Sequence, residues 1–172
     1  VDWHSAGEGS MGMFQFAPNE NKETVIEMKV ATSFISKAQA QHALLVEIAG
    51  DEGFDKVQAK ALKIWNDTLG SIEVVGGSYH ERVTFYSNLY RAFVYPTSLA
   101  ENTGTNEQPH WQHYSPYTRK VVDGQFVYNN GFWDTFRCLF PLLNLAYPSM
   151  NAQIQEGLLN TYKESGFLPE WA

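Results

Sequence analysis

The sequence has one cysteine, few basic residues and no long apolar run, and each shortage excludes a class of protein. With Cys138 alone, no disulfide can form within the chain. The 12 Lys and Arg residues are outnumbered by 19 Asp and Glu residues, which gives a net charge of -7 at pH 7. A nucleic-acid binder normally needs a broad positive surface, so we expect no nucleic-acid partner. No stretch reaches the roughly 18 apolar residues of a transmembrane helix, so we expect no membrane span.

The N-terminus also lacks the features of a secretory leader. The residues Val1-Asp2-Trp3-His4 have neither the charged nor the apolar region of a signal peptide, and they include no initiator Met. We therefore expect a processed chain or an excised fragment, and the localisation is unknown from these residues. A length of 172 residues is enough for one large domain or for pieces of two.

Two regions have the residue pattern of β-hairpins. The first joins predicted strands at 11–16 and 24–35 through the turn-forming residues 17–22. The second covers 119–130 and places the Asp123-Gly124 turn between β-prone residues.

Apolar residues at helical spacing predict five helices, over 37–49, 54–69, 79–95, 132–147 and 151–163. The segment 132–147 is apolar almost all round, which is typical of an enclosed helix, whereas 151–163 has a single apolar stripe and should lie outside it. Enclosed and covering helices in succession suggest a two-layered helical toroid.

The segment 97–117 is polar, contains proline and has no clear period, so we expect a long irregular loop of functional importance. His110 and His113 lie in this loop without a cysteine or carboxylate at ligand spacing, and we interpret them as solvent-exposed rather than as metal ligands. Cys138 is flanked by apolar residues, which favours a small buried side chain over a nucleophile.

The most informative motif is Trp133-Asp134-Thr135, at the start of an apolar helical segment. An indole can stack on the apolar face of a pyranose, and a carboxylate can accept hydrogen bonds from its hydroxyl groups. The alternative, in which Trp133 is core and Asp134 only caps the helix, is equally compatible with the spacing.

Taken together, several motifs resemble the calcium-dependent exo-acting α-mannosidases of glycoside hydrolase family 92. The resemblance covers most of the chain and rests on Gly12-Met13-Phe14, the segments 30–36 and 85–91, Gly131-Phe132-Trp133-Asp134-Thr135-Phe136-Arg137 and the closing 166–171, which contains Leu168-Pro169-Glu170-Trp171.

The resemblance implies a mostly α fold with a small β part. Residues 1–36 would be the C-terminal strands of a β-sandwich domain, 37–78 a helical linker, and 79–172 the first helices of an (α/α)6 catalytic barrel. This chain would then be an internal fragment.

The resemblance also implies that Trp133 and Asp134 line the subsite for a terminal mannose. Glu170 and Trp171 are weaker assignments to the same pocket, since a helix-end loop packed on its neighbours explains them equally well. The expected partner is a mannose-containing glycan.

The resemblance further implies an inverting α-1,2-mannosidase, an enzyme in which an acid and a base lie roughly 6.5 to 9.5 Å apart. Calcium is the expected cofactor, and it normally takes several oxygen ligands. The acid, the base and most calcium ligands are expected beyond residue 172, so we expect no catalytic or metal residue in this chain and no activity from it alone. A half-built barrel would expose apolar surface and favour self-association.

Two other readings remain open from the sequence. One is a non-catalytic glycan-binding or helical interaction module that uses Trp133 and the loop around Trp111. The other is a helical-toroid glycosidase or phosphorylase with a different sugar. The mannosidase resemblance itself implies an exported, periplasmic or cell-surface bacterial enzyme.

Overall fold

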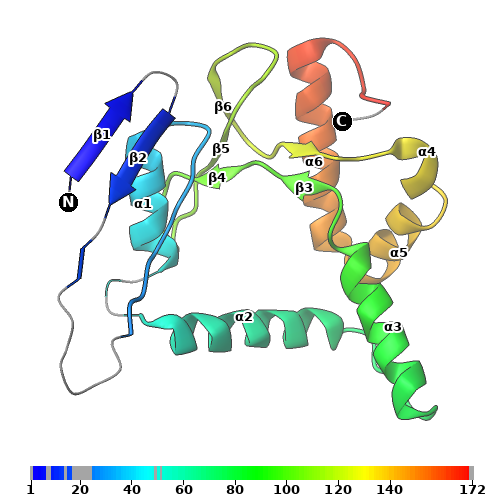
Figure 1. The fold of residues 1–172 in the computed structure, drawn as a ribbon. Coiled ribbons are helices and arrows are strands. Elements are labelled where there is room, and N and C mark those ends of the chain that lie inside the picture. The colour runs from blue at the N-terminus through cyan, green and yellow to red at the C-terminus, as the bar shows by residue number, and fades with distance from the viewer. Residues whose placement is uncertain are drawn as a thin grey trace.

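The computed structural model describes residues 2–6, 9–13, 15–16, 25–48, 50 and 52–170, and helices predominate in it (Figure 1). The helices are α1 (Lys37–Glu47), α2 (Phe54–Leu69), α3 (Tyr79–Ala92), α4 (Phe132–Thr135), α5 (Leu139–Ala146) and α6 (Pro148–Ser165). The prediction of a mostly α fold with a small β part is confirmed. Within the described ranges, every helix is too short or too polar to cross a membrane.

The strands of the described residues form three small antiparallel sheets. One sheet pairs β1 (Asp2–Ala6) with β2 (Gly9–Met13), and a second pairs β3 (Thr97–Ser98) with β7 (Val127–Tyr128). The third has the order β4 (Glu101–Asn102), β5 (Trp111–Tyr114) and β6 (Val121–Asp123). The segment predicted to be an irregular loop, 97–117, therefore contains three short strands.

Both predicted hairpins are wrong in their pairing. Residues 25–35 form no strand, and β2 pairs with the preceding β1 instead. At the second site β6 pairs with β5 and β7 with β3, because Gly124 has a φ of 101° and its N–H donates to the Trp111 carbonyl at 2.8 Å. The Asp123-Gly124 turn thus sends the chain into a different sheet.

The first three helices begin where the sequence indicates. The bounds of α2 are those predicted. Helix α1 is capped by the Ser36 hydroxyl, which accepts a hydrogen bond from the Gln39 N–H at 3.0 Å. Helix α3 begins with a Ser78–Glu81 capping box. The hydrogen bond from the Ser78 backbone lowers the pKa of the Glu81 carboxyl. Helix α3 ends at Ala92, before the predicted end at Tyr95.

The single helix predicted over 132–147 is divided into α4 and α5 by residues 136–138. Pro141 explains the break, because proline has no N–H to donate to the Arg137 carbonyl and its ring would clash with that group in a continuous helix. Pro141 is tolerated in the first turn of α5, where N–H groups have no partner within the helix.

The expected order of enclosure is also wrong. Helix α6 buries Ile154, Gly157, Leu158, Asn160 and Thr161. Helix α5 buries Leu143 alone, and α4 buries no residue. Sequence polarity was misleading because the polar residues of α6 are paired inside the protein: the Asn160 amide donates to the Gln125 carbonyl at 2.9 Å, and the Thr161 hydroxyl donates to the Gly157 carbonyl at 3.1 Å.

The apolar core lies where α6 meets α3, α5 and β7. It consists of Leu89, Val127, Leu143, Tyr147, Ile154 and Leu158. The Tyr147 hydroxyl donates to the Thr68 carbonyl at 3.2 Å, which links the end of α2 to this core, and burial raises the pKa of Tyr147. A Cβ atom on Gly157 would lie 3.1 Å from the Val127 nitrogen, so α6 approaches β7 closely only because residue 157 is glycine.

Two leucines of α5 test this core. Leu143 is 1% exposed and Leu145 is 85% exposed. We expect Leu143→Ala to lower the free energy of unfolding by about 2 to 5 kcal/mol, through lost apolar burial and a residual cavity. The matched change Leu145→Ala should alter it by less than about 0.5 kcal/mol. Urea denaturation of each variant measures the difference, and equal effects would contradict this position of the core.

Candidate functional site

The side chains of Trp133 and Asp134 are exposed on the short helix α4. Trp133 is 64% exposed, so it is not a core residue. The N-cap of α4 is Gly131, and no side chain caps this helix, so Asp134 does not serve as its cap. Among the described residues no hydrogen-bond partner is found for the Asp134 carboxylate. Both groups are therefore available to a ligand.

Arg137 fixes the orientation of the Trp133 indole. Its guanidinium carbon lies 4.1 Å from the centroid of the Trp133 ring and 4.4 Å from that of Phe136. The same guanidinium donates to the Trp133 carbonyl, one turn earlier. Such a cation–π contact contributes about 0.5 to 1 kcal/mol at an exposed position. The stacked guanidinium occupies one face of the indole.

Asn130 supports α4 from beneath and was not identified from the sequence. Its residue surface is 1% exposed. The Thr135 hydroxyl lies 3.2 Å from Asn130 Oδ1 and 3.0 Å from the Gly131 carbonyl oxygen. The Asn130 Nδ2 atom is buried without a partner in the part of the chain that the structure describes. The turn-forming run Asn129-Asn130-Gly131, with Asn129 at a φ of 59°, is the sequence signal that marks this support.

The chain returns to α4 at Glu170. The Phe132 N–H, the first of the helix, donates to the Glu170 carbonyl at 3.3 Å. The Glu170 side chain is exposed. Trp171, the fourth residue predicted to bind substrate, lies outside the described residues. The structure thus brings the backbone of Glu170 to the helix that carries Trp133 and Asp134, although 36 or more residues separate them in sequence.

An apolar hollow of about 360 Å³ lies beside this contact. It is lined by Phe132, Gln155, Leu158, Leu159, Leu168 and Pro169. The hollow joins the base of α4, the middle of α6 and the segment that leads to Glu170.

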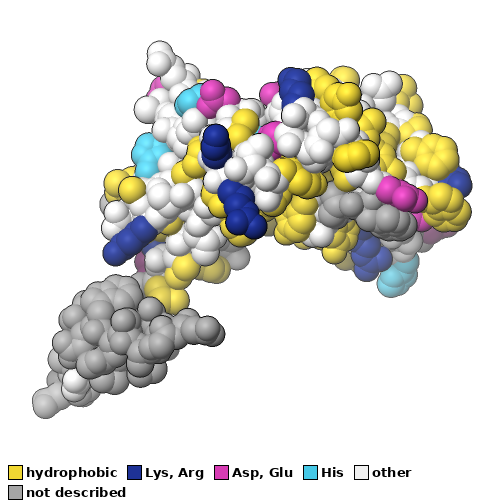
Figure 2. Space-filling model, turned by 90° about the horizontal axis from the view of Figure 1, so that it is seen from above, with side chains coloured by type: hydrophobic (Ala, Val, Ile, Leu, Met, Phe, Trp, Pro, Cys, Tyr) yellow, Lys and Arg dark blue, Asp and Glu magenta, His cyan; other side chains and the backbone are white. Residues whose placement is uncertain are grey.

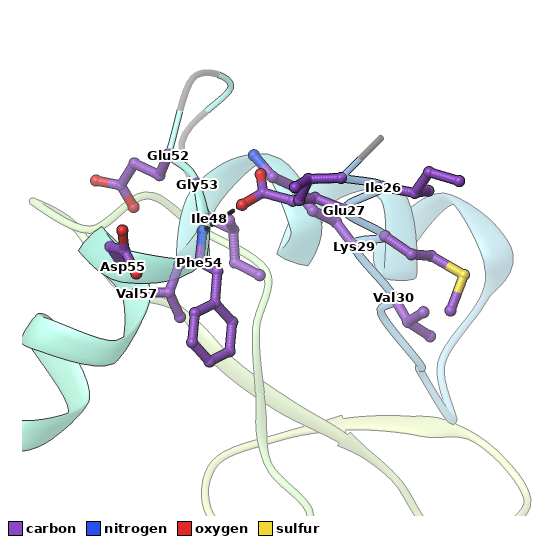
Figure 3. Close-up of a pocket in the computed structure, with 12 residues that line it drawn as sticks. Ile26, Glu27, Lys29, Val30, Ile48, Glu52, Gly53, Phe54, Asp55 and Val57 are labelled. Carbon is purple, nitrogen blue, oxygen red and sulfur yellow. Dashed lines mark hydrogen bonds between the residues drawn. The ribbon is translucent and has the colours of Figure 1, made fainter. Parts of the chain in front are cut away.

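A larger cavity of about 680 Å³ lies at a different place, between residues 25–30 and the start of α2 (Figure 3). Two of its three carboxylates, those of Glu27 and Glu52, have structural partners. Glu27 accepts a hydrogen bond from the Phe54 N–H at 3.1 Å and so caps α2, where Gly53 has no side chain to do so. Glu52 pairs with Lys60 at 2.5 Å. No residue of the α4 site lines this cavity.

Predictions for the two loop histidines and the cysteine have mixed outcomes. His110 is exposed, as expected, and its Nε2 lies 3.2 Å from Asp123 Oδ1. The prediction for His113 is wrong, because it lies on β5 and is 0% exposed. The prediction for Cys138 is also wrong, because it lies in the break between α4 and α5 and is exposed.

The described residues do not fit a calcium site. Among them, no three His, Cys, Asp or Glu side chains come together in a way that could hold a metal ion. Calcium normally requires six to eight oxygen ligands, mostly from carboxylates, carbonyls and water.

Comparison with known proteins identifies relatives of this chain. The model of the glycosyl hydrolase family 92 catalytic domain matches residues 39–172. The family GH92 inverting mannosidase BT2199 from Bacteroides thetaiotaomicron VPI-5482 is 41% identical, with a TM-score of 0.75 over 81% of this chain. The GH92 family glycosyl hydrolase ccman5 is 22% identical, with a TM-score of 0.63 over 77% of this chain, which supports the fold. No curated protein matches this chain.

The chain is much shorter than both of these solved structures. It spans 18% of the length of BT2199 and 17% of that of ccman5.

Thr135 tests the support beneath α4. Thr135→Val removes the hydroxyl that bonds Asn130, leaving both polar atoms of a buried amide unpaired. We expect the free energy of unfolding to fall by about 1 to 3 kcal/mol. The control Thr84→Val changes an exposed threonine of α3 and should have an effect below about 0.5 kcal/mol. If urea denaturation gives Thr135→Val the stability of the unmodified chain, Asn130 does not depend on this hydroxyl.

Proposed function

Because the chain belongs to glycosyl hydrolase family 92, we propose that it forms part of the mannose-binding surface of a glycoside hydrolase that releases terminal mannose from glycans. The observation that carries the proposal is the exposed pair Trp133 and Asp134 on α4, held from behind by Arg137 and Asn130. The 41% identity with an inverting mannosidase supports mannose as the sugar.

Trp133 would provide the stacking surface. The C–H groups on one face of a mannose ring form an apolar patch, and burying that patch against an indole removes both surfaces from water. An immobilised ring loses less conformational freedom on binding than a mobile one. The Arg137 guanidinium, 4.1 Å from the ring centroid, supplies that immobilisation before the sugar arrives.

Asp134 would bind the sugar hydroxyls. An ionised carboxylate accepts hydrogen bonds only, and two hydroxyls on adjacent carbons can each donate to one of its oxygens. Hydrogen bonds to a charged group contribute about 1.5 to 3 kcal/mol. The free carboxylate beside an exposed indole is the arrangement that a pyranose requires. Glu170 and Trp171 are proposed as more distant contributors, with Glu170 brought to α4 by its backbone carbonyl.

We further propose that the chemical step depends on residues outside this chain. Inverting hydrolysis needs an acid that protonates the leaving oxygen and a base that activates water, roughly 6.5 to 9.5 Å apart. The chain spans 18% of the inverting mannosidase BT2199, which supports this division of roles. Calcium dependence, specificity for α-1,2 linkages, the export of a bacterial parent protein and the assignment of 1–36, 37–78 and 79–172 to sandwich, linker and barrel remain predictions.

A second candidate function is glycan binding without hydrolysis. Trp111 is 41% exposed on β5, so this sheet offers another aromatic side chain to a ligand. In that case Trp111, as well as Trp133, would contribute to sugar binding.

Self-association of the isolated chain is the remaining part of the proposal. Hydrophobic side chains form several patches on the face that Figure 2 shows. Phe136, Leu145, Phe167 and Leu168 are each more than half exposed. Exposed patches of this kind normally mark a surface that another molecule or segment covers. Size-exclusion chromatography should give an apparent mass that rises with concentration, and a constant monomer mass of 19.5 kDa would contradict self-association.

Sugar binding tests the proposed function directly. We expect Asp134→Asn to weaken the binding of methyl α-mannoside by about tenfold, and Trp133→Ala to weaken it by about tenfold or more. Titration followed by NMR spectroscopy suits weak binding. The matched control Asp55→Asn changes an exposed acidic residue in the first turn of α2 and should leave the affinity unchanged.

Two results of the same titration would change the interpretation. Unaltered affinity in both Asp134→Asn and Trp133→Ala would contradict the assignment of the site to α4. A loss of affinity in Trp111→Ala comparable to that in Trp133→Ala would favour the glycan-binding module.

A further inference from the structure

The buried pair His113–Glu164 is the strongest feature that the proposed function leaves unused. His113 lies in the middle of β5 and is 0% exposed, with its ring stacked on Phe126 at a centroid distance of 4.8 Å. Its Nε2 atom lies 2.9 Å from Oε1 of Glu164, a side chain that is 7% exposed, in the last turn of α6. The pair therefore ties the three-stranded sheet to the end of α6.

Both ring nitrogens of His113 face oxygen atoms. Nδ1 lies 3.0 Å from the Gly124 carbonyl oxygen, which can only accept, so Nδ1 carries a proton. The contact between Nε2 and Glu164 Oε1 then requires a second proton, held on one of these two atoms. The other carboxylate oxygen, Glu164 Oε2, is buried without a partner among the described residues. His113 is thus the one side chain in that part of the chain that compensates this carboxylate.

The segment bound to this pair leads directly into α4. Gly124 is followed by Gln125, whose carbonyl accepts from Asn160, and by Val127, which packs on Gly157. This segment is therefore held against α6 at two points, Gln125 and Val127. Three residues further on, Asn130 supports the helix that carries Trp133 and Asp134.

The other end of the pair leads back to the same helix. Directly after Glu164, the Ser165 hydroxyl donates to the Thr161 carbonyl at 2.7 Å, and Gly166 ends α6 with a φ of 83°. The chain then runs through 167–169 to the Glu170 carbonyl, which accepts from the Phe132 N–H. Of the two segments that fix the position of α4, one therefore begins at Gly124, which His113 contacts, and the other begins at Glu164.

We propose that His113 and Glu164 are positioning residues that hold the start of α4, and with it Trp133 and Asp134, in the orientation that binds a mannose-containing ligand. The ligand part rests on the proposed function, whereas the effect on α4 does not. Neither residue touches the sugar; they act through residues 124–130 and 165–170.

Hydrogen exchange measured by mass spectrometry tests the effect on α4 in the 172-residue chain. Glu164→Ala leaves His113 without its carboxylate, and Glu164→Asp withdraws the carboxylate by one methylene while keeping its charge. We expect exchange in 129–137 and 166–170 to rise by about tenfold or more in both, since breaking a buried pair strongly favours local opening. Exchange in α2, which lies away from this pair, should be unchanged (Figure 1).

Two further variants complete the comparison. In Glu164→Gln the amide can donate to Nε2 while Nδ1 still donates to Gly124, so exchange in 129–137 should stay within about threefold of the unmodified chain. Lys163→Ala removes an exposed charged side chain from the same helix and should have no effect. A rise of exchange in α2 as large as that in 129–137 would mean that the pair stabilises the whole chain rather than α4, which would overturn the proposal. So would unchanged exchange in 129–137 for both Glu164→Ala and Glu164→Asp.

Sugar affinity separates this proposal from the proposed function. Faster exchange in 129–137, with methyl α-mannoside bound at least about tenfold more weakly, supports both. Faster exchange without any mannoside binding by the unmodified chain supports the role of the pair in holding α4 and contradicts the proposed function. Weakened binding without faster exchange contradicts the positioning role alone.

Discussion

The close approach of α6 to β7 at Gly157 is the constraint on which the rest of this structure depends. Because residue 157 has no side chain, the helix lies directly against Val127, and Leu158 and Ile154 join Leu143 and Tyr147 in one core. A larger residue would push the helix away from the strand. That movement would also shift residues 128–131, which carry the chain from β7 to α4.

The same packing explains why Trp133 remains exposed. Helix α4 has four residues and ends before the break that Pro141 requires, so it is too short to bury an apolar face of its own. It is held instead by the Asn130–Thr135 contact and by the Glu170 carbonyl. A short helix fixed at its base and open at its surface is suited to presenting an indole and a carboxylate to a sugar. The family membership of the chain and this local geometry therefore support the same function.

Features that depend on local residues could be predicted from the sequence. The bounds of α2 follow from apolar periodicity, and the start of α1 from Ser36. The division at Pro141 was missed, although proline within an apolar helical segment disrupts the preceding turn.

Features that depend on distant partners could not be predicted in this way. Strand pairing failed at Asp123-Gly124 because β6 and β7 join different sheets, which no turn motif specifies. His113 was predicted to be exposed because its partner, Glu164, lies 51 residues away. Of the candidate site, Trp133 and Asp134 are exposed, and their role in sugar binding stays a prediction. The supporting roles of Asn130 and Arg137 required the structure.

The most direct test of the proposed function is to measure mannose release from an α-linked mannobiose. This chain and the longer natural chain that contains it would each be assayed with calcium and with a chelator. We expect no release by the 172-residue chain and chelator-sensitive release by the longer one. Release by the 172-residue chain alone would contradict the proposal that the catalytic acid and base lie elsewhere. A well-folded longer chain that releases no mannose would contradict the mannosidase assignment itself.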